Sequence, residues 1–414
     1  MIGPVRFRLI AVTFTLTTLL YVDRIAISVA KEPITSELVL SDTSFGWVLS
    51  AFALGYALFQ TPGGMLADRF GPRAVLTSIV ILWSLFTGLT GLAWGLASLL
   101  VFRFVFGAAE AGAFPTLART FYNWLPTSER GLAQGINFSG SRLGAAFALP
   151  AVAALLTMTG WREAFLILGG IGIFWALGWY LWFRDRPEDH SAVSSSELAT
   201  IAAGREPEST ASAPPARPFL SLIKDRNVQL LMGQYFASNF TFFFCLTWLF
   251  PYLQTTYKLD TVDTGFLTAL PLIGGAIGNW VAGSAVDTLY KRGWGDKSRR
   301  YVAIVGFALA AIGLLGSMGA ESAFIAVAWL TLAIFGADLT LPPSWTSCID
   351  IGGKQSGSVS GTMNMAGNIG SFIVSFAFPY LLLAFGSAQA FFVVGATLNV
   401  LGMIAWMRLR TGAA

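Results

Sequence analysis

Long apolar stretches separated by short polar segments repeat along the whole chain. Each contains about 20 residues, the length that an α-helix needs to cross the hydrocarbon layer of a bilayer. They lie near residues 8–29, 44–67, 74–93, 97–122, 131–157, 162–183, 227–254, 264–289, 301–320, 323–349, 357–384 and 387–407. We therefore predict an all-α polytopic membrane protein with twelve transmembrane helices.

The composition agrees with a lipid environment. Of the 414 residues, 55% are hydrophobic and 12% are charged, whereas soluble domains contain about 25% charged residues. Cys245 and Cys348 both fall in apolar stretches, without the spacing of a disulfide framework or a metal site. We expect the lipid bilayer as a partner, and we expect no metal and no cofactor.

The distribution of basic residues predicts the orientation. Most Lys and Arg lie in the amino-terminal tail, the even-numbered loops and the carboxyl-terminal end, whereas the opposite loops hold only Lys31, Arg162 and Lys258. Basic loops stay on the cytoplasmic side, so we expect both termini in the cytoplasm. The net charge of +4 then needs no nucleic-acid partner. The tails are short and the N-x-S/T sites, Asn137 and Asn239, fall inside apolar stretches, which favours the cytoplasmic (inner) membrane of a bacterium.

Residues 184–225 interrupt the apolar pattern with Ser, Ala, Pro and charged residues. This composition is typical of a linker that is partly disordered. We predict a cytoplasmic linker between an amino-terminal six-helix half, 1–183, and a carboxyl-terminal six-helix half, 226–414. The single histidine, His190, lies in this linker, which excludes a histidine proton relay inside the membrane.

The two halves also echo each other in sequence. GGMLADRFGPR at 63–73 and GNWVAGSAVDTLYKR at 278–292 each follow the second apolar stretch of their half. Both segments place an acid, Asp68 or Asp287, before basic residues. A parallel repeat of six-helix halves is one of the recognised transporter architectures.

Four charged residues lie where a lipid-embedded chain should have none. Asp23 and Arg24 are in the first apolar stretch, and Arg103 and Glu110 are in the fourth. An ionisable residue at membrane depth is costly and normally faces the bundle interior or a water-filled cavity, where it marks an ion or substrate route. Two acids beside two arginines fit a device that binds an anion and carries protons with it.

Arg103 and Glu110 are seven residues apart. On an α-helix they project within about 20° of each other and lie roughly 10 Å apart along the axis. A carboxyl that is both buried and close to an arginine can change its protonation state when a neighbour moves. We assign both residues to proton coupling. The alternative is a static ion pair that stabilises the bundle.

Asp23 and Arg24 are neighbours, so they point about 100° apart on a helix and should have different partners. The planar fork of an arginine matches a carboxylate with two parallel hydrogen bonds. Arg24 is therefore the first candidate for the substrate carboxylate, and Asp23 is the candidate for a second proton site. The alternative is that both side chains extend toward the outer membrane–water interface, where their charged groups contact water.

These residues belong to longer motifs. GGMLADRFGPR resembles the signature between the second and third spans of the major facilitator superfamily. Further motifs resemble its anion:cation symporter family, which includes bacterial sugar-acid transporters and animal carriers of the sialin and vesicular glutamate type. They are Tyr21-Val-Asp23-Arg24, Gly55-Tyr56 with Gln60 and Pro62, Arg103-Phe-Val-Phe-Gly107-Ala-Ala-Glu110-Ala-Gly-Ala-Phe-Pro115, Asn123-Trp124-Leu-Pro126 with Glu129-Arg130-Gly131, and more loosely Pro343-Ser344-Trp345 and Asn364 with Asn368.

The resemblance implies the major facilitator fold and a transporter of organic anions, and it gives Arg24 and Asp23 the same roles as above. It also places further residues in the substrate cavity, where aromatic faces would contact a sugar or ring and amides would contact hydroxyls. These residues are Tyr21, Tyr56, Ser344, Trp345 and Asn364. The alternative for each aromatic residue is ordinary packing.

Two more charges lie at membrane depth. Arg142 stands in the fifth stretch, where we would expect a neutral polar residue in a sugar-acid carrier. A second deep arginine indicates a dicarboxylate or a compact, strongly anionic substrate, or else it pairs with Glu110 or another acid. Asp338, in the tenth stretch, either helps in proton coupling or bonds to the helix broken by Pro342-Pro343; we favour the bond to the helix.

Asp68, Arg69 and Arg73 are predicted to have a conformational, gating role. Ion pairs and a helix-end interaction would hold the two halves together while the cavity faces outward, with Arg119 and Glu129-Arg130 as candidate partners. The alternative, the positive-inside rule alone, explains the two arginines but not Asp68.

We predict a proton-coupled symporter that imports an organic anion, a sugar acid or a similar carboxylate, by alternating access and as a monomer. The alternatives are an exchanger or exporter of the same fold and the uptake of an aromatic carboxylate. A membrane-embedded enzyme is a remote alternative, because the sequence has no HExxH or GxSxG motif and no histidine in an apolar stretch. We therefore expect no enzymatic activity.

Overall fold

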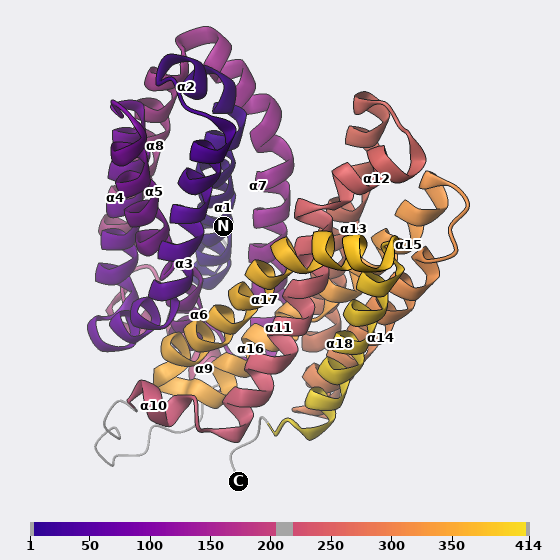
Figure 1. Ribbon diagram of the computed structural model, residues 1–414. Helices are drawn as coiled ribbons and strands as arrows, with labels where there is room; N and C mark the ends of the chain where they lie inside the picture. The colour runs from indigo at the N-terminus through magenta and orange to yellow at the C-terminus, as the bar shows by residue number, and fades with distance from the viewer. Residues whose placement is uncertain (1–3, 204–217, 411–414) are drawn as a thin grey trace. The chain divides into compact units, whose positions relative to one another are not determined.

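The computed structural model describes residues 4–203 and 218–410. These residues form eighteen α-helices and no strand (Figure 1), which confirms the all-α prediction. The helices are α1 Val5–Val29, α2 Lys31–Glu37, α3 Asp42–Phe70, α4 Pro72–Gly91, α5 Leu96–Glu110, α6 Ala113–Trp124, α7 Arg130–Thr159, α8 Trp161–Trp182, α9 Ser195–Ala203, α10 Phe219–Leu222, α11 Arg226–Thr247, α12 Leu249–Tyr257, α13 Thr261–Leu289, α14 Lys297–Ser317, α15 Ala323–Leu339, α16 Leu341–Gly352, α17 Ser356–Phe385 and α18 Gln389–Arg408.

Every predicted apolar stretch coincides with one α-helix or with two consecutive ones. Three stretches are broken, into α5 and α6, α11 and α12, and α15 and α16. Among the described residues, eight helical segments are long and apolar enough to cross a membrane, or ten when each of two bent pairs counts as one span. One of the eight, 323–385, contains two of the predicted stretches.

Local sequence signals set the helix ends. The hydroxyl of Ser41 accepts the N–H of Ser44 at 3.1 Å before α3, and Ser322 caps α15 in the same way. Such side chains satisfy N–H groups that the first helical turn leaves unpaired. The α3 helix ends at Gly71, whose φ of 84° suits glycine, and Pro72 then begins α4.

Two helical stretches bend sharply. The axes of α11 and α12 differ by 57° across the break at Trp248, and α7 bends by 44° where Pro150 follows. A proline cannot donate its backbone nitrogen and clashes with the carbonyl four residues earlier, so a bend at Pro150 is expected. No such residue stands at Trp248 itself, and Pro251 lies one turn later.

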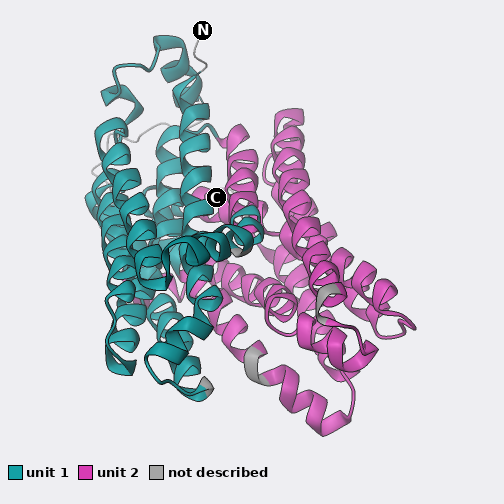
Figure 2. Ribbon diagram, turned by 90° about the horizontal axis from the view of Figure 1, so that it is seen from above, with its two compact units in different colours: residues 1–126, 143–216, 352–361 teal, residues 127–142, 217–351, 362–414 magenta. Residues whose placement is uncertain are grey.

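The chain packs into two compact units (Figure 2). Unit 1 comprises residues 1–126, 143–216 and 352–361, and unit 2 comprises residues 127–142, 217–351 and 362–414. The α7 helix therefore begins in unit 2 and ends in unit 1, whereas α17 begins in unit 1 and ends in unit 2. The division at residues 183 and 226, which follows chain order, stays a prediction.

Each unit has its own apolar core. In unit 1, α4 packs against α8 and α3 against α5, and a buried cluster includes Ile27 and Phe165. In unit 2, α14 packs against α15 and α18, and the buried cluster is rich in phenylalanine. The rings of Phe244 and Phe391 lie 4.9 Å apart at its centre. Aromatic pairs of this kind add to the free energy gained from burial.

The first part of the predicted linker is folded onto unit 1. The carboxylate of Glu197, in α9, accepts the N–H groups of Val5 at 3.1 Å and Arg6 at 2.9 Å, at the start of α1. His190 lies edge-on to the ring of Trp124, and burial lowers the pKa of this histidine. The remaining part of the predicted disorder, 204–217, lies outside the described residues.

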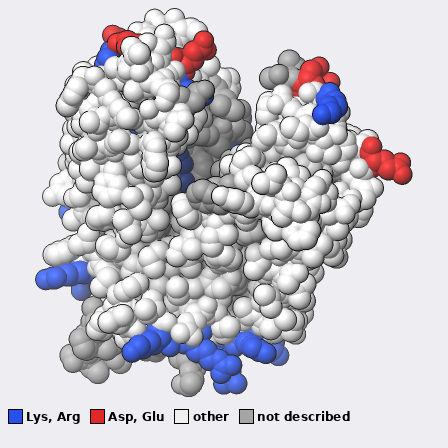
Figure 3. Space-filling model, viewed as in Figure 1, with Lys and Arg blue, Asp and Glu red and all other residues white. Residues whose placement is uncertain are grey.

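Most charged side chains that are visible on the surface in Figure 3 lie toward the two ends of the view. Figure 3 shows Lys and Arg mainly at one end of the view and Asp and Glu at the other, with a largely uncharged surface between them. An uncharged band is what contact with lipid requires, because a charge facing hydrocarbon is costly.

Candidate functional site

Arg24 and Glu110 form an ion pair inside unit 1. Nε of Arg24, in α1, donates to Oε1 of Glu110 at 3.1 Å, and Nη2 donates to the same oxygen. Glu110 is the last residue of α5 and its side chain is fully buried. The guanidinium holds the carboxylate through one oxygen, and the other, Oε2, has no hydrogen-bond partner among the described residues.

Three aromatic rings surround the guanidinium of Arg24. The ring centres of Tyr21, Phe52 and Tyr56 lie 4.8, 5.1 and 4.5 Å from its Cζ atom. The faces of these rings attract a cation, and they keep the guanidinium in one orientation. The sequence predicts Tyr21 and Tyr56 at this site. It does not predict Phe52, although this residue stands one helical turn before Tyr56 on α3.

Asp23 contacts a different helix from its neighbour. Its Oδ2 accepts the indole N–H of Trp83, in α4, at 3.1 Å, and the side chain is fully buried. The helical spacing predicts different partners for Asp23 and Arg24, and this part of the prediction is confirmed. Burial of Asp23 also argues against a pair that extends to the outer interface. Trp83 escaped prediction, although a buried indole N–H needs an acceptor.

Arg103 is buried in unit 1 between aromatic rings, with its Cζ 4.3 Å from the ring centre of Phe106 and 5.2 Å from that of Phe52. Within the described residues, several buried polar atoms of these charged side chains have no hydrogen-bond partner: Nε and Nη1 of Arg103, Oδ1 of Asp23 and Oε2 of Glu110. Such atoms cost free energy unless water, a proton or a ligand satisfies them. Glu110 forms its ion pair with Arg24. The alternative of a static pair between Arg103 and Glu110 therefore does not describe this structure.

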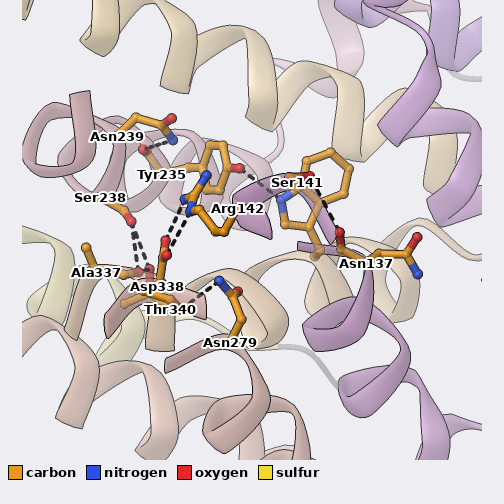
Figure 4. Close-up of polar contacts among 12 residues, drawn as sticks. Asn137, Ser141, Arg142, Tyr235, Ser238, Asn239, Asn279, Ala337, Asp338 and Thr340 are labelled. Carbon is orange, nitrogen blue, oxygen red and sulfur yellow. Dashed lines mark hydrogen bonds and ion pairs between the residues drawn. The ribbon is translucent and has the colours of Figure 1, made fainter. Parts of the chain in front are cut away.

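Arg142 and Asp338 form a second ion pair, in unit 2 (Figure 4). Nε of Arg142, in α7, donates to Oδ2 of Asp338, in α15, at 2.9 Å, and Nη2 donates to Oδ1 at 2.7 Å. Pairing with an acid was one of the two interpretations of Arg142, and the acid is Asp338, not Glu110. The prediction that the Asp338 carboxylate bonds to the helix broken at Pro342-Pro343 is wrong. This carboxylate accepts its hydrogen bonds from Arg142.

The predicted cavity residues of unit 2 lie on α16 and α17. The indole N–H of Trp345 donates to the hydroxyl of Tyr235 at 3.0 Å, and Tyr235 lies beside Arg142 in Figure 4. The hydroxyl of Ser344 donates to the side-chain oxygen of Gln234 at 3.0 Å. Asn364 is buried in α17. Tyr235 and Gln234 escaped prediction because no charged residue lies near them on α11 to draw attention to this helix.

Asp68 binds the beginning of α17 within unit 1. Its carboxylate accepts the N–H groups of Gly357 at 3.0 Å and Ser358 at 2.7 Å, and the Ser358 hydroxyl also donates to it. Nε of Arg119 lies 3.8 Å from the carboxylate. A carboxylate at a helix N-terminus satisfies unpaired N–H groups and interacts with the positive end of the helix dipole. Asp68 thus makes a helix-end interaction, and Arg119 is its nearby cation.

Asp287 does in unit 2 what Asp68 does in unit 1. Its two carboxylate oxygens accept the N–H groups of Gly131 at 2.9 Å and Leu132 at 2.8 Å, in the first turn of α7. The sequence repeat pairs Asp287 with Asp68, but it gives no partner for Asp287. Arg130, a candidate partner for Asp68, instead forms an ion pair with Asp350 at 2.8 Å.

The two arginines after Asp68 have local partners. The guanidinium of Arg73 donates to the carbonyl of Tyr180 at 2.7 and 2.9 Å, and the N–H of Arg73 donates to Asp185 at 2.8 Å. Burial raises the pKa of the Asp185 carboxyl. Cζ of Arg69 lies 5.0 Å from the ring centre of Phe70. The gating role of the set remains a prediction.

The chain matches one large family of proteins. The model of the Major Facilitator Superfamily matches residues 13–375. The chain is 37% identical over 386 residues to the probable sulfoacetate transporter SauU of Cupriavidus necator, covering 93% of this chain and 89% of that protein. It is 30% identical over 420 residues to the probable galactarate/D-glucarate transporter GarP of Escherichia coli K12, covering 97% and 94%.

Solved structures agree on the fold. A crystal structure of a variant of the E. coli fucose:proton symporter FucP superposes with a TM-score of 0.73 at 15% identity, covering 98% of this chain and 99% of that one. The predicted fold is thereby confirmed.

Replacing Trp83 by Phe should destabilise the protein, because Oδ2 of the buried Asp23 loses its donor. A buried acceptor left without a partner costs about 1–3 kcal/mol, which should lower the midpoint of thermal unfolding of the purified protein in detergent. Trp94→Phe is the matched control, since Trp94 is 77% exposed and its replacement should change the midpoint little. Equal shifts in the two variants would show that the bond to Asp23 contributes nothing.

Proposed function

Because the chain belongs to the major facilitator superfamily, we propose that it is a secondary active transporter that imports an organic anion together with protons by alternating access. The chain is a transporter and not an enzyme. The observation that carries the proton-coupled part of the proposal is the ion pair between Arg24 and Glu110, beside the buried carboxyl of Asp23.

The ion pair supplies a direct way to couple the two solutes. While Glu110 is ionised, it occupies the guanidinium of Arg24. Protonation of Glu110 removes the negative charge that holds the arginine, and the arginine fork then binds the substrate carboxylate. Arg103, which like Arg24 lies against the ring of Phe52, would influence the charge of Glu110, and Asp23 offers a second carboxyl for a proton. Binding of anion and proton would then depend on each other, as symport requires.

The substrate that we propose is a sugar acid or a similar small carboxylate. Relatives named for their substrates support this class: SauU is named for sulfoacetate and GarP for galactarate and D-glucarate. Tyr21 and Tyr56 beside Arg24 offer aromatic faces for a sugar or ring. The other proposed binding residues are Arg142, Ser344, Trp345 and Asn364. An aromatic carboxylate remains the alternative substrate.

The proposed setting is the cytoplasmic membrane of a bacterium, with both termini in the cytoplasm and a monomer as the working form. The charge distribution of the loops supports the orientation. Asp68, Arg69 and Arg73 would act in the conformational cycle, in which the helix-end contact of Asp68 forms and breaks. An exchanger or exporter of the same fold is the alternative, and the direction of transport would then follow the substrate gradient.

An inward-directed proton gradient should drive accumulation of a carboxylate by the protein in proteoliposomes. The panel should contain L-galactonate, D-glucarate and sulfoacetate, and a neutral analogue without the acid group, which should be ignored. In a parallel experiment a sodium gradient replaces the proton gradient, with the same pH on both sides of the membrane and the voltage clamped. Equally fast uptake with sodium alone would contradict the proton assignment.

Arg24→Lys should reduce substrate binding by roughly tenfold or more, because the charge is kept but the planar fork is lost. The measurement is the dissociation constant of the transported carboxylate for the purified protein. Arg162→Lys is a suitable control, since Arg162 is 32% exposed, pairs with Glu37 and has no proposed role in binding or gating. Unchanged affinity in Arg24→Lys would move the carboxylate to another arginine.

Glu110→Gln should separate exchange from accumulation. The neutral glutamine resembles the protonated acid, so the substrate can still bind and exchange across the membrane, but no proton can be released. Counterflow exchange should persist while proton-driven accumulation fails, both measured on the same preparation. Loss of both would give Glu110 a structural or direct binding role, and retention of both would give the coupling role to Asp23.

A further inference from the structure

The Arg142–Asp338 pair has the geometry of a ligand seated in an anion site (Figure 4). The two oxygens of Asp338 accept parallel hydrogen bonds of 2.9 and 2.7 Å from Nε and Nη2 of Arg142. An arginine fork binds the carboxylate of a small molecule in the same way, and two oxygens of a tetrahedral acid group fit it equally. The side chains are only 6% and 1% exposed.

Stability alone does not account for this pair. Removing two charges from water costs about as much as their attraction returns, so a buried ion pair is often no more stabilising than apolar residues of similar size. The two residues are 196 positions apart and lie on two different helices, α7 and α15. At membrane depth, ionisable side chains mark routes for ions or substrates.

The surroundings of the pair are shaped for a carboxylate. On α13, a Cβ atom at Gly275 would clash with Oδ2 of Asp338, so a glycine is needed to leave room for the acid. The ring of Phe242 lies 3.6 Å from Cζ of the arginine and supports its flat face. The hydroxyls of Ser238 and Thr340, 2.9 Å apart, brace the turn that follows Asp338.

We propose that Asp338 is an internal ligand of an anion site at Arg142, and that an acidic group of a transported dianion displaces it. The ligands of this site are compact dianions, with two carboxylates or with a carboxylate and a sulfonate. The inference rests on the proposed function, because it assumes that the chain transports carboxylates.

Internal competition makes the site selective. A monoanion carries one negative charge, no more than Asp338 already supplies, and it therefore leaves the Arg142–Asp338 pair intact. A dianion replaces one acid by another on the same guanidinium, so the arginine keeps a bidentate partner, and the displaced Asp338, left without its cation, takes up a proton. A hydroxyl or a neutral ester cannot compete with Asp338, because it carries no charge to offset the attraction that it would break.

The test compares ligands that differ in one charge. Malonate and sulfoacetate are the dianions and monomethyl malonate is the monoanion, and their dissociation constants are measured by calorimetry on the purified full-length protein. Wild-type protein should bind the dianions more tightly than the monoester. Asp338→Asn removes the competitor and should tighten dianion binding roughly tenfold or more, since hydrogen bonds to charged groups are the strong ones, and it should tighten monoester binding less.

A double variant separates a loss of the anion site from misfolding caused by an unpaired buried charge. Arg142→Gln with Asp338→Asn leaves no uncompensated buried charge, and it should bind dianions no better than the monoester. The control is Arg130→Gln, which removes one of the two arginines that pair with Asp350 and leaves Arg299 as its partner; it should leave the ratio of dianion to monoester affinity unchanged.

Two results would overturn the inference. One is that wild-type protein binds neither dianion more tightly than the monoester. The other is that Asp338→Asn changes the dissociation constants of all three ligands by the same factor. Proton-driven uptake of L-galactonate, a monocarboxylate, is measured alongside. If this uptake persists while Asp338→Asn leaves the ratio of dianion to monoester affinity unchanged, the inference fails and the proposed function stands. If no carboxylate is taken up under a proton gradient, the proposed function itself fails.

Discussion

The cost of holding an ionised side chain away from water governs the arrangement of this protein. Each unit contains an arginine that binds a buried carboxylate, Arg24 with Glu110 in unit 1 and Arg142 with Asp338 in unit 2. Because a buried charge without a partner is far costlier than a paired one, any event that takes the carboxylate away must supply a substitute anion or a proton. The same constraint that stabilises the resting pairs therefore makes them responsive to two kinds of solute, protons and anions.

The order of apolar and charged residues along the chain predicted the features that depend on local chemistry, namely the helices and the charged residues within them. The apolar stretches fell on helices because a span of fixed length must be apolar throughout, and the deep charges stood out against them. The partners of these charges could not be predicted, since Arg24 and Glu110 are 86 positions apart and Arg142 and Asp338 are 196 apart. Trp83 was missed for a related reason: one tryptophan in an apolar span is unremarkable until the acid beside it is known.

The sequence repeat was informative in a limited way. It identified Asp68 and Asp287 as equivalent acids, and the structure gives both the same task, since each carboxylate accepts two N–H groups from the first turn of a helix. In the sequence, Gly131 and Gly357 stand out only as small residues. Their backbone N–H groups are what the acids bind, and no periodicity of side chains reports on a backbone donor.

The position of Asp68 also constrains the order in which the protein can be made. Its acceptor atoms bind the N–H of Ser358, 290 residues later in the chain. At about 5–20 residues per second, a ribosome needs roughly 15–60 seconds to synthesise that interval. The amino-terminal helices therefore emerge and insert well before unit 1 can be completed. During biogenesis this carboxylate stays hydrated until Ser358, near the carboxyl end of the chain, has been made, and a nascent chain that stalls in between leaves unit 1 unfinished.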